Sequence, residues 1–221
     1  MGSSKEKIKK EVVEQLYWDS RVDASQIEVE VEGGRVILKG VVPNYHAKNA
    51  ASSDTWTISG VKEVDNQIEV KYPASVTVPT DEQIESDIEK ALEINLNIEA
   101  EDIDITATAG IVNLEGTVDA YWKKTRAEKI ASEVSGVLDI ENKLKIVPTK
   151  SQDKAIAEEI ISSLERNVKV NAENVDVKVK GGIVTLSGTV LGRSAYRAVL
   201  NTAEFTEGVV GINDNLLIEN M

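Results

Sequence analysis

The stretch GGRVILKGVV, from Gly33 to Val42, decides the fold, because the chain repeats it twice more. It returns as AGIVNLEGTV over residues 109–118 and as GGIVTLSGTV over residues 181–190. All three copies share the pattern Gly-x-Val-x-Leu-x-Gly-x-Val, at spacings of 76 and then 72 residues. Repeats that stack into solenoids have shorter periods of roughly 20 to 50 residues. The sequence therefore predicts three small tandem domains, referred to below as the first, second and third copies.

Prolines mark the junctions between the copies. Pro73 and Pro79 flank the first junction and Pro148 opens the second, and proline interrupts both strand pairing and helices. A unit of this size buries only about 60% of its unfolded surface, so we expect intramolecular packing between neighbouring copies. The predicted domains span residues 1–72, 73–148 and 149–221.

Each copy shows the same order of predicted elements. An apolar stripe at positions i, i+4 and i+8, such as Ile8, Val12 and Leu16, predicts a first helix. Alternating residues then predict a strand, and glycine at the turn, such as Gly33-Gly34, predicts a tight hairpin into a second strand. A Gly-Val pair ends a second helix, and a third strand closes the copy. The second helices are predicted at about residues 44–58, 120–134 and 192–206.

The composition excludes several classes of function. The 221 residues include 25 Lys and Arg, 38 Asp and Glu, no Cys and one His, His46. A net charge of −13 repels nucleic-acid phosphates, so we expect no nucleic-acid partner. Without Cys or clustered His, the chain offers no thiolate nucleophile, disulfide or multi-His metal site. Its carboxylates follow no catalytic spacing, and we expect no enzyme activity, metal or cofactor.

The N-terminal sequence bears on location. In MGSSKEKIKKEVVEQL the basic residues run directly into an amphipathic pattern, without the apolar stretch of a signal peptide. No apolar run approaches the roughly 18 residues that cross a bilayer, so no transmembrane segment is expected. The predicted location is the cytoplasm, and the periplasm is the alternative if a signal peptide has been removed.

The triple motif resembles the BON domain of bacteria. Each copy adds a Gly-Val ending about 20 residues after the central glycine, with Asn66, Asn142 or Asn215 before its last strand. The likeness covers nearly the whole chain, which looks like the cytoplasmic triple-BON subgroup. It implies an α+β fold of three tandem αββαβ domains, each with two helices packed on one face of a three-stranded mixed sheet. It also implies non-enzymatic work of the hyperosmotically inducible and transport-associated kind, in envelope maintenance, stress tolerance and phospholipid binding.

The repeated glycines are interpreted as structural. They do not fit the phosphate-binding pattern Gly-x-Gly-x-x-Gly, and they lie within and after a hairpin instead of between a strand and a helix. Their predicted roles are turn geometry and, at Gly40, Gly116 and Gly188, the close approach of a helix to the sheet.

Aromatic and basic side chains gather at the start of the second helix of each copy. Aromatic rings suit the membrane interface and cations suit anionic phosphates, so these residues are the predicted lipid or partner contacts. In the alternative, the aromatics pack on a neighbouring copy and the cations are solvated. Trp18 and Trp56, elsewhere in the first copy, are interpreted as core or interface residues. The predicted contacts are Tyr45, His46, Lys48, Tyr121, Trp122, Lys123, Lys124, Arg126, Lys129, Arg193, Tyr196 and Arg197.

The charge is unevenly divided among the copies. Residues 1–72 hold 10 basic and 12 acidic groups, a net charge of −2; residues 73–148 hold 7 and 16, or −9; and residues 149–221 hold 8 and 10, or −2.

We expect a binding module that associates with anionic phospholipid or an envelope component under osmotic stress. The alternative is a cytoplasmic interaction scaffold or ion-responsive stress protein, whose acidic middle copy meets a cation or a basic protein. No EF-hand spacing is present, so a solvated acidic face is expected there.

Overall fold

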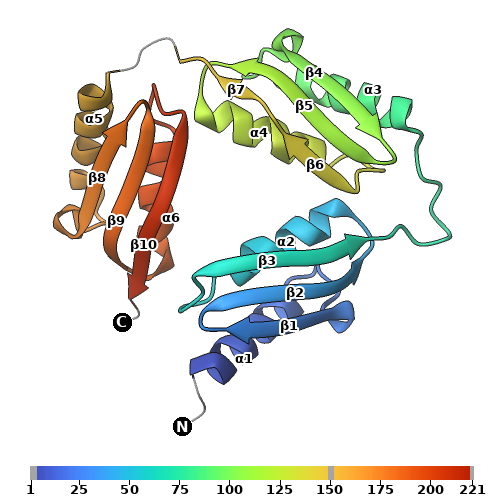
Figure 1. Ribbon diagram of the computed structural model, residues 1–221, viewed down its shortest axis with the longest axis horizontal. Coiled ribbons are helices and arrows are strands. Elements are labelled where there is room, and N and C mark those ends of the chain that lie inside the picture. The colour runs from blue at the N-terminus through green and yellow to red at the C-terminus, as the bar shows by residue number, and fades with distance from the viewer. Residues whose placement is uncertain (1–3, 149–151, 220–221) are drawn as a thin grey trace. The chain divides into compact units, whose positions relative to one another are not determined.

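The computed structural model describes residues 4–148 and 152–219 and shows the same order of elements three times (Figure 1). A short 3-10 turn precedes the first strand of each copy. The predicted domain starts at residues 1 and 149 lie outside the described residues. The first copy contains α1 (Ser4–Trp18), η1 (Ala24–Gln26), β1 (Ile27–Glu32), β2 (Arg35–Val42), α2 (Tyr45–Thr55) and β3 (Glu63–Val70).

The other two copies follow the same plan, except that the last strand of the second copy is split in two. The chain forms two compact units, and the second copy contributes residues to both. The second copy contains α3 (Asp81–Glu93), η2 (Ala100–Asp102), β4 (Ile103–Thr108), β5 (Ile111–Val118), α4 (Tyr121–Ser132), β6 (Asp139–Asn142) and β7 (Lys145–Ile146). The third contains α5 (Asp153–Glu165), η3 (Ala172–Asn174), β8 (Val175–Lys180), β9 (Ile183–Leu191), α6 (Gly192–Glu204) and β10 (Gly211–Glu219).

Every sheet places the second strand of its copy at the centre. The strand orders are β1-β2-β3, β4-β5-β6 and β10-β9-β8, and β7 also pairs with β5. In the first and third copies the hairpin strands are antiparallel, whereas the last strand runs parallel to the central one. A parallel partner requires a crossover, which the second helix provides. These mixed sheets confirm the predicted α+β class and the order αββαβ.

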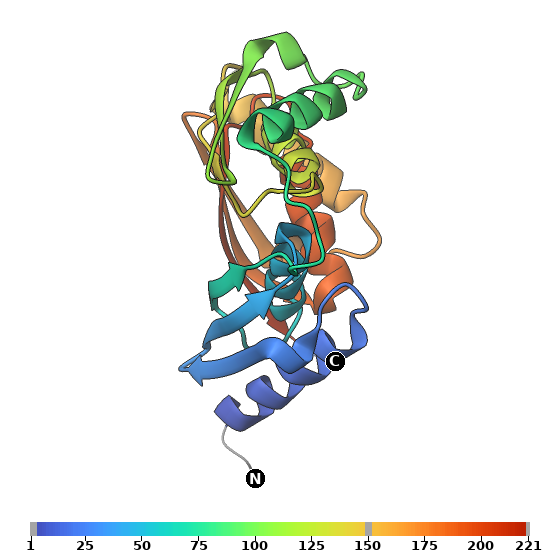
Figure 2. The same cartoon turned by 90° about the vertical axis from the view of Figure 1, so that its right-hand side faces the viewer.

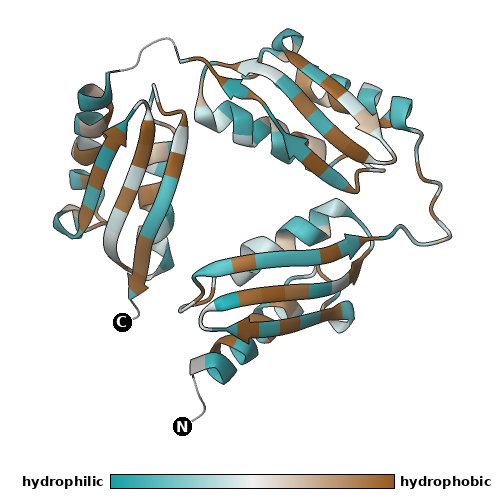
Figure 3. Ribbon diagram, viewed as in Figure 1, coloured by the Kyte–Doolittle hydropathy of each residue, from teal (hydrophilic) through white to brown (hydrophobic). Residues whose placement is uncertain are grey.

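The core of each copy lies between the helices and one face of its sheet. Figure 2 shows α1 on one side of the first sheet, and Figure 3 shows the alternation of apolar and polar residues along the strands. The predicted stripe Ile8, Val12 and Leu16 is buried at the helix–sheet contact. Small side chains on the second helix, such as Ala47 and Ala51, are fully buried and let that helix lie close to the strands.

Gly116 marks a point where two backbone segments almost touch. A Cβ atom there would lie 2.1 Å from the carbonyl oxygen of Asp102, and the corresponding distances are 1.9 Å at Gly40 and 2.0 Å at Gly188. The predicted close approach is confirmed, but its predicted partner, a helix, is wrong. The partner is the last carbonyl of the 3-10 turn, because antiparallel pairing places the first residue of the strand opposite this glycine, as with Ile27 and Gly40.

The hairpin turns require positive φ at both central residues, as in type I′ turns. In the third copy these are Gly181 and Gly182, with φ of 59° and 75°. In the second copy the first of the two positions is occupied by Ala109, whose φ is 52°. The second copy therefore holds a residue with a Cβ atom in the left-handed region, which costs roughly 1 kcal/mol.

A carboxylate at the start of the first helix binds the hairpin turn in two of the copies. Asp153 accepts hydrogen bonds from the backbone N–H groups of Gly181 and Gly182 at 2.8 and 2.9 Å. Asp81 does the same in the second copy, with Ala109 and Gly110, at 2.8 and 2.9 Å. These bonds lower the pKa of the Asp153 carboxyl group. The first helix and the hairpin are thus connected directly.

Replacing Ala109 by glycine should stabilise the second copy. Ala109→Gly relieves the left-handed strain, and the gain is partly offset by the greater freedom of glycine in the unfolded chain, leaving about 0.5 kcal/mol. That corresponds to a rise of about 2–4 °C in the melting temperature of a domain of this size, measurable by calorimetry. Gly181→Ala is the matched reverse change, because Gly181 has a similar φ and no atom within 4 Å of its added Cβ, and it should lower stability. Equal melting of both variants and the parent would contradict the strain.

Candidate functional site

Two predicted contact cations of the second copy are engaged within the protein. Lys123 is only 8% exposed, and its ammonium group lies 2.7 Å from Glu99 Oε2 and 2.8 Å from Asp119 Oδ1. Burial disfavours its charged form, but the hydrogen bonds to Asp119 and Glu99 outweigh burial and raise the pKa of Lys123. The Lys124 ammonium group donates to the carbonyl oxygen of Leu144 at 2.8 Å. Neither group is presented to solvent as a free cation.

The neighbouring aromatic residues pack against elements of the third copy, within one compact unit. Tyr121 lies against the third core, and the Trp122 and Phe205 ring centres are 6.3 Å apart at an angle of 40°. Thr125 donates a hydrogen bond from its hydroxyl to the Glu204 carboxylate at 2.6 Å. Burial raises the pKa of the Tyr121 hydroxyl, as do nearby carboxylates. These contacts support the alternative in which the aromatics pack on a neighbouring copy.

Other predicted contacts of the second and third copies lie at the surface. Arg126 and Lys129 are exposed on α4, and Arg197 is exposed on α6. Arg193, at the start of α6, is half-buried and interacts within the protein. Three of the twelve predicted residues therefore present exposed cations on second helices.

In the first copy the predicted contacts are mostly covered. Tyr45 is 7% exposed, and the Lys48 ammonium group lies 5.7 Å from the centre of its ring and 3.9 Å from Asp139 Oδ1. His46 is half-buried and lines a cleft of about 520 Å³ that Tyr72 also lines. The contacts of Tyr45 and Lys48 therefore also support the alternative in which these residues serve packing within the protein.

Tyr196 has a structural role in the third copy. Its hydroxyl donates a hydrogen bond to the Asp214 carboxylate, and burial together with that carboxylate raises the pKa of Tyr196. The residue of the first copy that corresponds to Asp214 is Asn66, whose side-chain amide donates to the Lys48 carbonyl oxygen at 2.9 Å. Asp214 also accepts from the Leu216 N–H, as Asn66 does from Ile68. The motif residue of the third copy is therefore Asp214, not Asn215 as the sequence pattern suggested.

A cluster of charges at the helices of the first copy was missed by sequence reasoning. Arg21 donates through Nε to both carboxylate oxygens of Asp19, at 2.9 and 3.0 Å. Asp54, on α2, is 7% exposed, and its Oδ2 has no hydrogen-bond partner in the described part of the chain. Burial, and then the neighbouring Asp19, raise the pKa of Asp54 to about 6, whereas the hydrogen bonds from Arg21 hold the pKa of Asp19 well below its usual range. Only three-dimensional proximity reveals this cluster.

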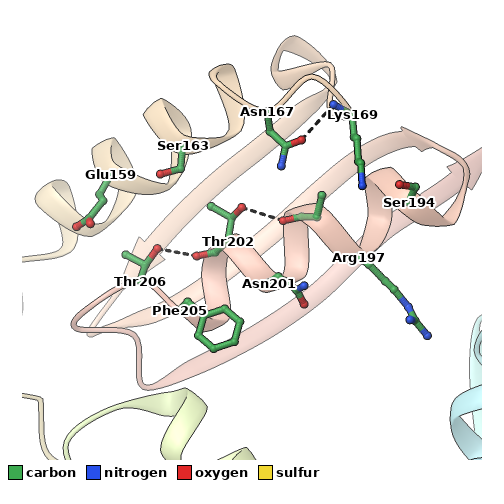
Figure 4. A pocket seen from close by; sticks show the side chains of 11 residues that line it. Glu159, Ser163, Asn167, Lys169, Ser194, Arg197, Asn201, Thr202, Phe205 and Thr206 are labelled. Atoms are coloured by element: carbon green, nitrogen blue, oxygen red, sulfur yellow. Dashed lines mark hydrogen bonds between the residues drawn. The ribbon is translucent and has the colours of Figure 1, made fainter.

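A polar groove between α5 and α6 was also missed. It has a volume of about 630 Å³ and is lined by residues of both helices and of the loop after α5 (Figure 4). Among its lining residues only Arg197 was predicted as a contact. Comparison of the three copies in register would have revealed the change in charge at this place.

The fold and its surface define a class of protein, a tandem array of small α+β domains, of which the third has a polar groove between its two helices. No group of three or more His, Cys, Asp or Glu residues is placed to hold a metal ion within residues 4–148 and 152–219. In the same ranges no helix is long and apolar enough to cross a membrane. The family model of the BON domain matches residues 4–72, 80–148 and 152–220, and the chain belongs to this family.

Two curated relatives are similar over part of the chain. The osmotically-inducible protein Y of Escherichia coli (strain K12) is 28% identical over 143 residues, covering 62% of this chain and 71% of the relative. The outer membrane lipoprotein DolP of Haemophilus influenzae is 30% identical over 105 residues, covering 47% and 54%. The chain thus spans about half the length of that lipoprotein. A solved structure of CdsD, a structural protein of the type III secretion system of Chlamydia trachomatis, aligns over 96% of this chain and 92% of its own, at 16% identity and a TM-score of 0.28.

Proposed function

We propose that this protein is a non-enzymatic binding protein of three BON domains, at residues 1–72, 73–148 and 149–221, that associates with anionic phospholipid surfaces during osmotic or envelope stress. Membership of the BON family supports the proposal. The names of the relatives point in the same direction, one to osmotic induction and one to the outer membrane. The sequence predicts the cytoplasm as its location, whereas the lipoprotein's name favours the envelope, and fractionation of cells decides between the two.

The observation that carries the proposal is an exposed apolar side chain at the end of the first helix, or in the loop after it, in every copy. Trp18 is 81% exposed, Leu96 is 97% exposed and Val168 is 99% exposed. Isolated apolar residues on a surface are ordinary. Here, however, Leu96 and Val168 occupy equivalent positions 72 residues apart, and Trp18 is equivalent to Ile94, which is 80% exposed, 76 residues further on. This repetition in two pairs of copies indicates a shared use. Such side chains lose contact with water when they enter the interfacial zone of a bilayer.

Cations accompany these apolar residues and the second helices. Arg166 and Lys169 flank Val168 in the sequence, and Arg126, Lys129 and Arg197 are the predicted contacts that remain exposed. Cations close to an anionic leaflet contribute about 1 kcal/mol each. We assign these groups to headgroup contact and assign Tyr45, Tyr121, Trp122 and Lys123 to packing.

A vesicle co-sedimentation experiment tests the proposal. The triple variant Trp18→Ser, Leu96→Ser, Val168→Ser should weaken binding to vesicles with one quarter phosphatidylglycerol at least tenfold, which equals about 1.4 kcal/mol. The control triple, Ile111→Ser, Ile183→Ser, Leu217→Ser, removes partly exposed apolar residues from strands and should bind as the parent does. Equal recovery with neutral and anionic vesicles, or equal binding by the two triples, would overturn the proposal.

A further inference from the structure

The groove between α5 and α6 is entered by a lysine from the loop after α5. Figure 4 shows the Lys169 side chain extending toward the first turn of α6, where Ser194 stands. Arg197 stands one turn further along α6 with its side chain exposed. The one carboxylate that lines the groove, Glu159, lies at the end away from Lys169.

Within the described ranges the two cations of this groove have no carboxylate partner, and neutral hydrogen-bond donors lie around them. Among the described residues, no carboxylate lies within salt-bridge distance of Lys169 or Arg197. The Asn167 side-chain oxygen accepts from the Lys169 backbone N–H at 3.1 Å, which leaves its amide N–H groups free to donate. The Ser194 hydroxyl and the Asn201 amide, also in the lining, add further donors. The groove thus offers positive charge and donors without a matching anion.

The first copy shows what the same place looks like when an anion is built in. Counting by the repeat of 76 and 72 residues, Asn167, Lys169 and Thr202 correspond to Asp19, Arg21 and Asp54. In the first copy Arg21 is hydrogen-bonded to Asp19, and buried Asp54 lies beside that pair. The third copy keeps the cation and replaces both carboxylates by neutral side chains. Arg21 of the first copy is thus neutralised by a carboxylate of the protein itself. Lys169 of the third copy is available to an anion from outside the protein.

We propose that the groove between α5 and α6 is a binding site for the phosphate group of an anionic ester, with Lys169 and Arg197 as its cations. The available donors come from a loop and from two turns of α6, so they approach a ligand from several directions. A tetrahedral phosphate group presents oxygens in several directions, whereas a carboxylate presents two in one plane. Arg and Lys are also the side chains with which proteins most often bind phosphate.

The inference deepens the proposed function, and it rests on that function for one point only, the identity of the ester as a lipid headgroup. The nearby Val168 and Phe205, which are 99% and 63% exposed, favour an ester that is attached to an apolar body. A soluble phosphate ester tests the groove itself, because its binding requires no membrane.

Titration of the full chain, followed by amide NMR shifts, tests the proposal with sn-glycerol 1-phosphate as the soluble ester. We expect saturable shifts confined to residues 167–169 and 194–202. Lys169→Gln should weaken binding tenfold or more, and Arg197→Gln should weaken it several-fold. Lys178→Gln is the matched control, since Lys178 lies on β8, has a 76% exposed side chain and already pairs with Asp176 at 2.9 Å. Its binding should equal that of the parent.

A second variant builds the carboxylates of the first copy into the third. Asn167→Asp with Thr202→Asp should abolish ester binding while retaining both cations, and unchanged amide spectra elsewhere show that the fold is kept. Absence of saturable shifts, or equal weakening of ester binding by Lys178→Gln and Lys169→Gln, would overturn the proposal that this groove binds a phosphate ester.

Vesicles separate the two proposals. Weaker binding of Lys169→Gln to phosphatidylglycerol vesicles than of Lys178→Gln supports a lipid headgroup in the groove. If the ester binds and anionic vesicles do not, the groove stands and the phospholipid function falls. If vesicles bind and the ester leaves the groove unshifted, the phospholipid function stands and the groove falls.

Discussion

Gly116→Val is expected to cost the second copy about 4 kcal/mol, nearly the whole stability of a domain of this size. The new Cβ would lie 2.1 Å from the Asp102 carbonyl oxygen, a backbone atom that cannot move without displacing η2. Overpacking contributes about 1–3 kcal/mol, and a φ of 117° in a branched residue adds a similar amount. Amide hydrogen exchange resolved by copy measures the loss.

Thr117→Val is the control for this change. It introduces the same side chain at the next residue of β5, where the native side chain is exposed. Exchange protection in the second copy should fall sharply for Gly116→Val and stay close to that of the parent for Thr117→Val. Native protection in the Gly116→Val variant would show that the 3-10 turn yields easily, and the structural interpretation of the glycine motif would be wrong.

Asp54→Asn is expected to raise the stability of the first copy by about 2 kcal/mol at pH 7.5 and by almost nothing at pH 4. The buried carboxyl has a pKa of about 6 when folded, above its ordinary value, so the folded state binds the proton more tightly. Stability is therefore lost as the pH rises from about 4 to about 6 and stays low above that range. Asparagine lacks this titration.

Denaturant unfolding at a series of pH values measures this effect. The parent should lose stability between pH 4 and 6, whereas Asp54→Asn should have a flatter profile. Glu32→Gln removes one negative charge at an exposed position of β1 and should keep the parent's profile. A variant less stable than the parent at pH 7.5 would show that the Asp54 charge is needed by Arg21.

The repeated motif made the fold predictable because each of its residues has a local physical role. Leu38, Leu114 and Leu186 are fully buried at the centres of their sheets, and the apolar stripe of each first helix is buried as its spacing required. The exposure of Trp18 was not predicted. It follows Leu16 by two residues, and a rotation of about 100° per residue turns it away from the buried stripe.

The contacts of charged side chains could not be predicted, because they depend on residues far apart in the sequence. Lys123 was predicted as a surface contact. Its ammonium group is instead hydrogen-bonded to Glu99, 24 residues earlier, and the side chain is buried. Arg21 and Lys169 occupy matching positions in two copies, and only the identity of the residues around them separates a neutralised cation from an unpaired one. A single sequence contains that difference in residue identity, but only the distances between the side chains show which cation is paired.

The bond between Asp153 and the hairpin has a consequence for synthesis on the ribosome. The carboxylate emerges 28 residues before Gly181, the first of its two donors, so the leading helix leaves the exit tunnel without its partner. At about 5–20 residues per second this interval lasts a few seconds. Lys5 occupies the same position in the first copy, so the first helix of that copy does not form this carboxylate bond. In the second and third copies, by contrast, the bond to the first helix forms only after the hairpin has been synthesised.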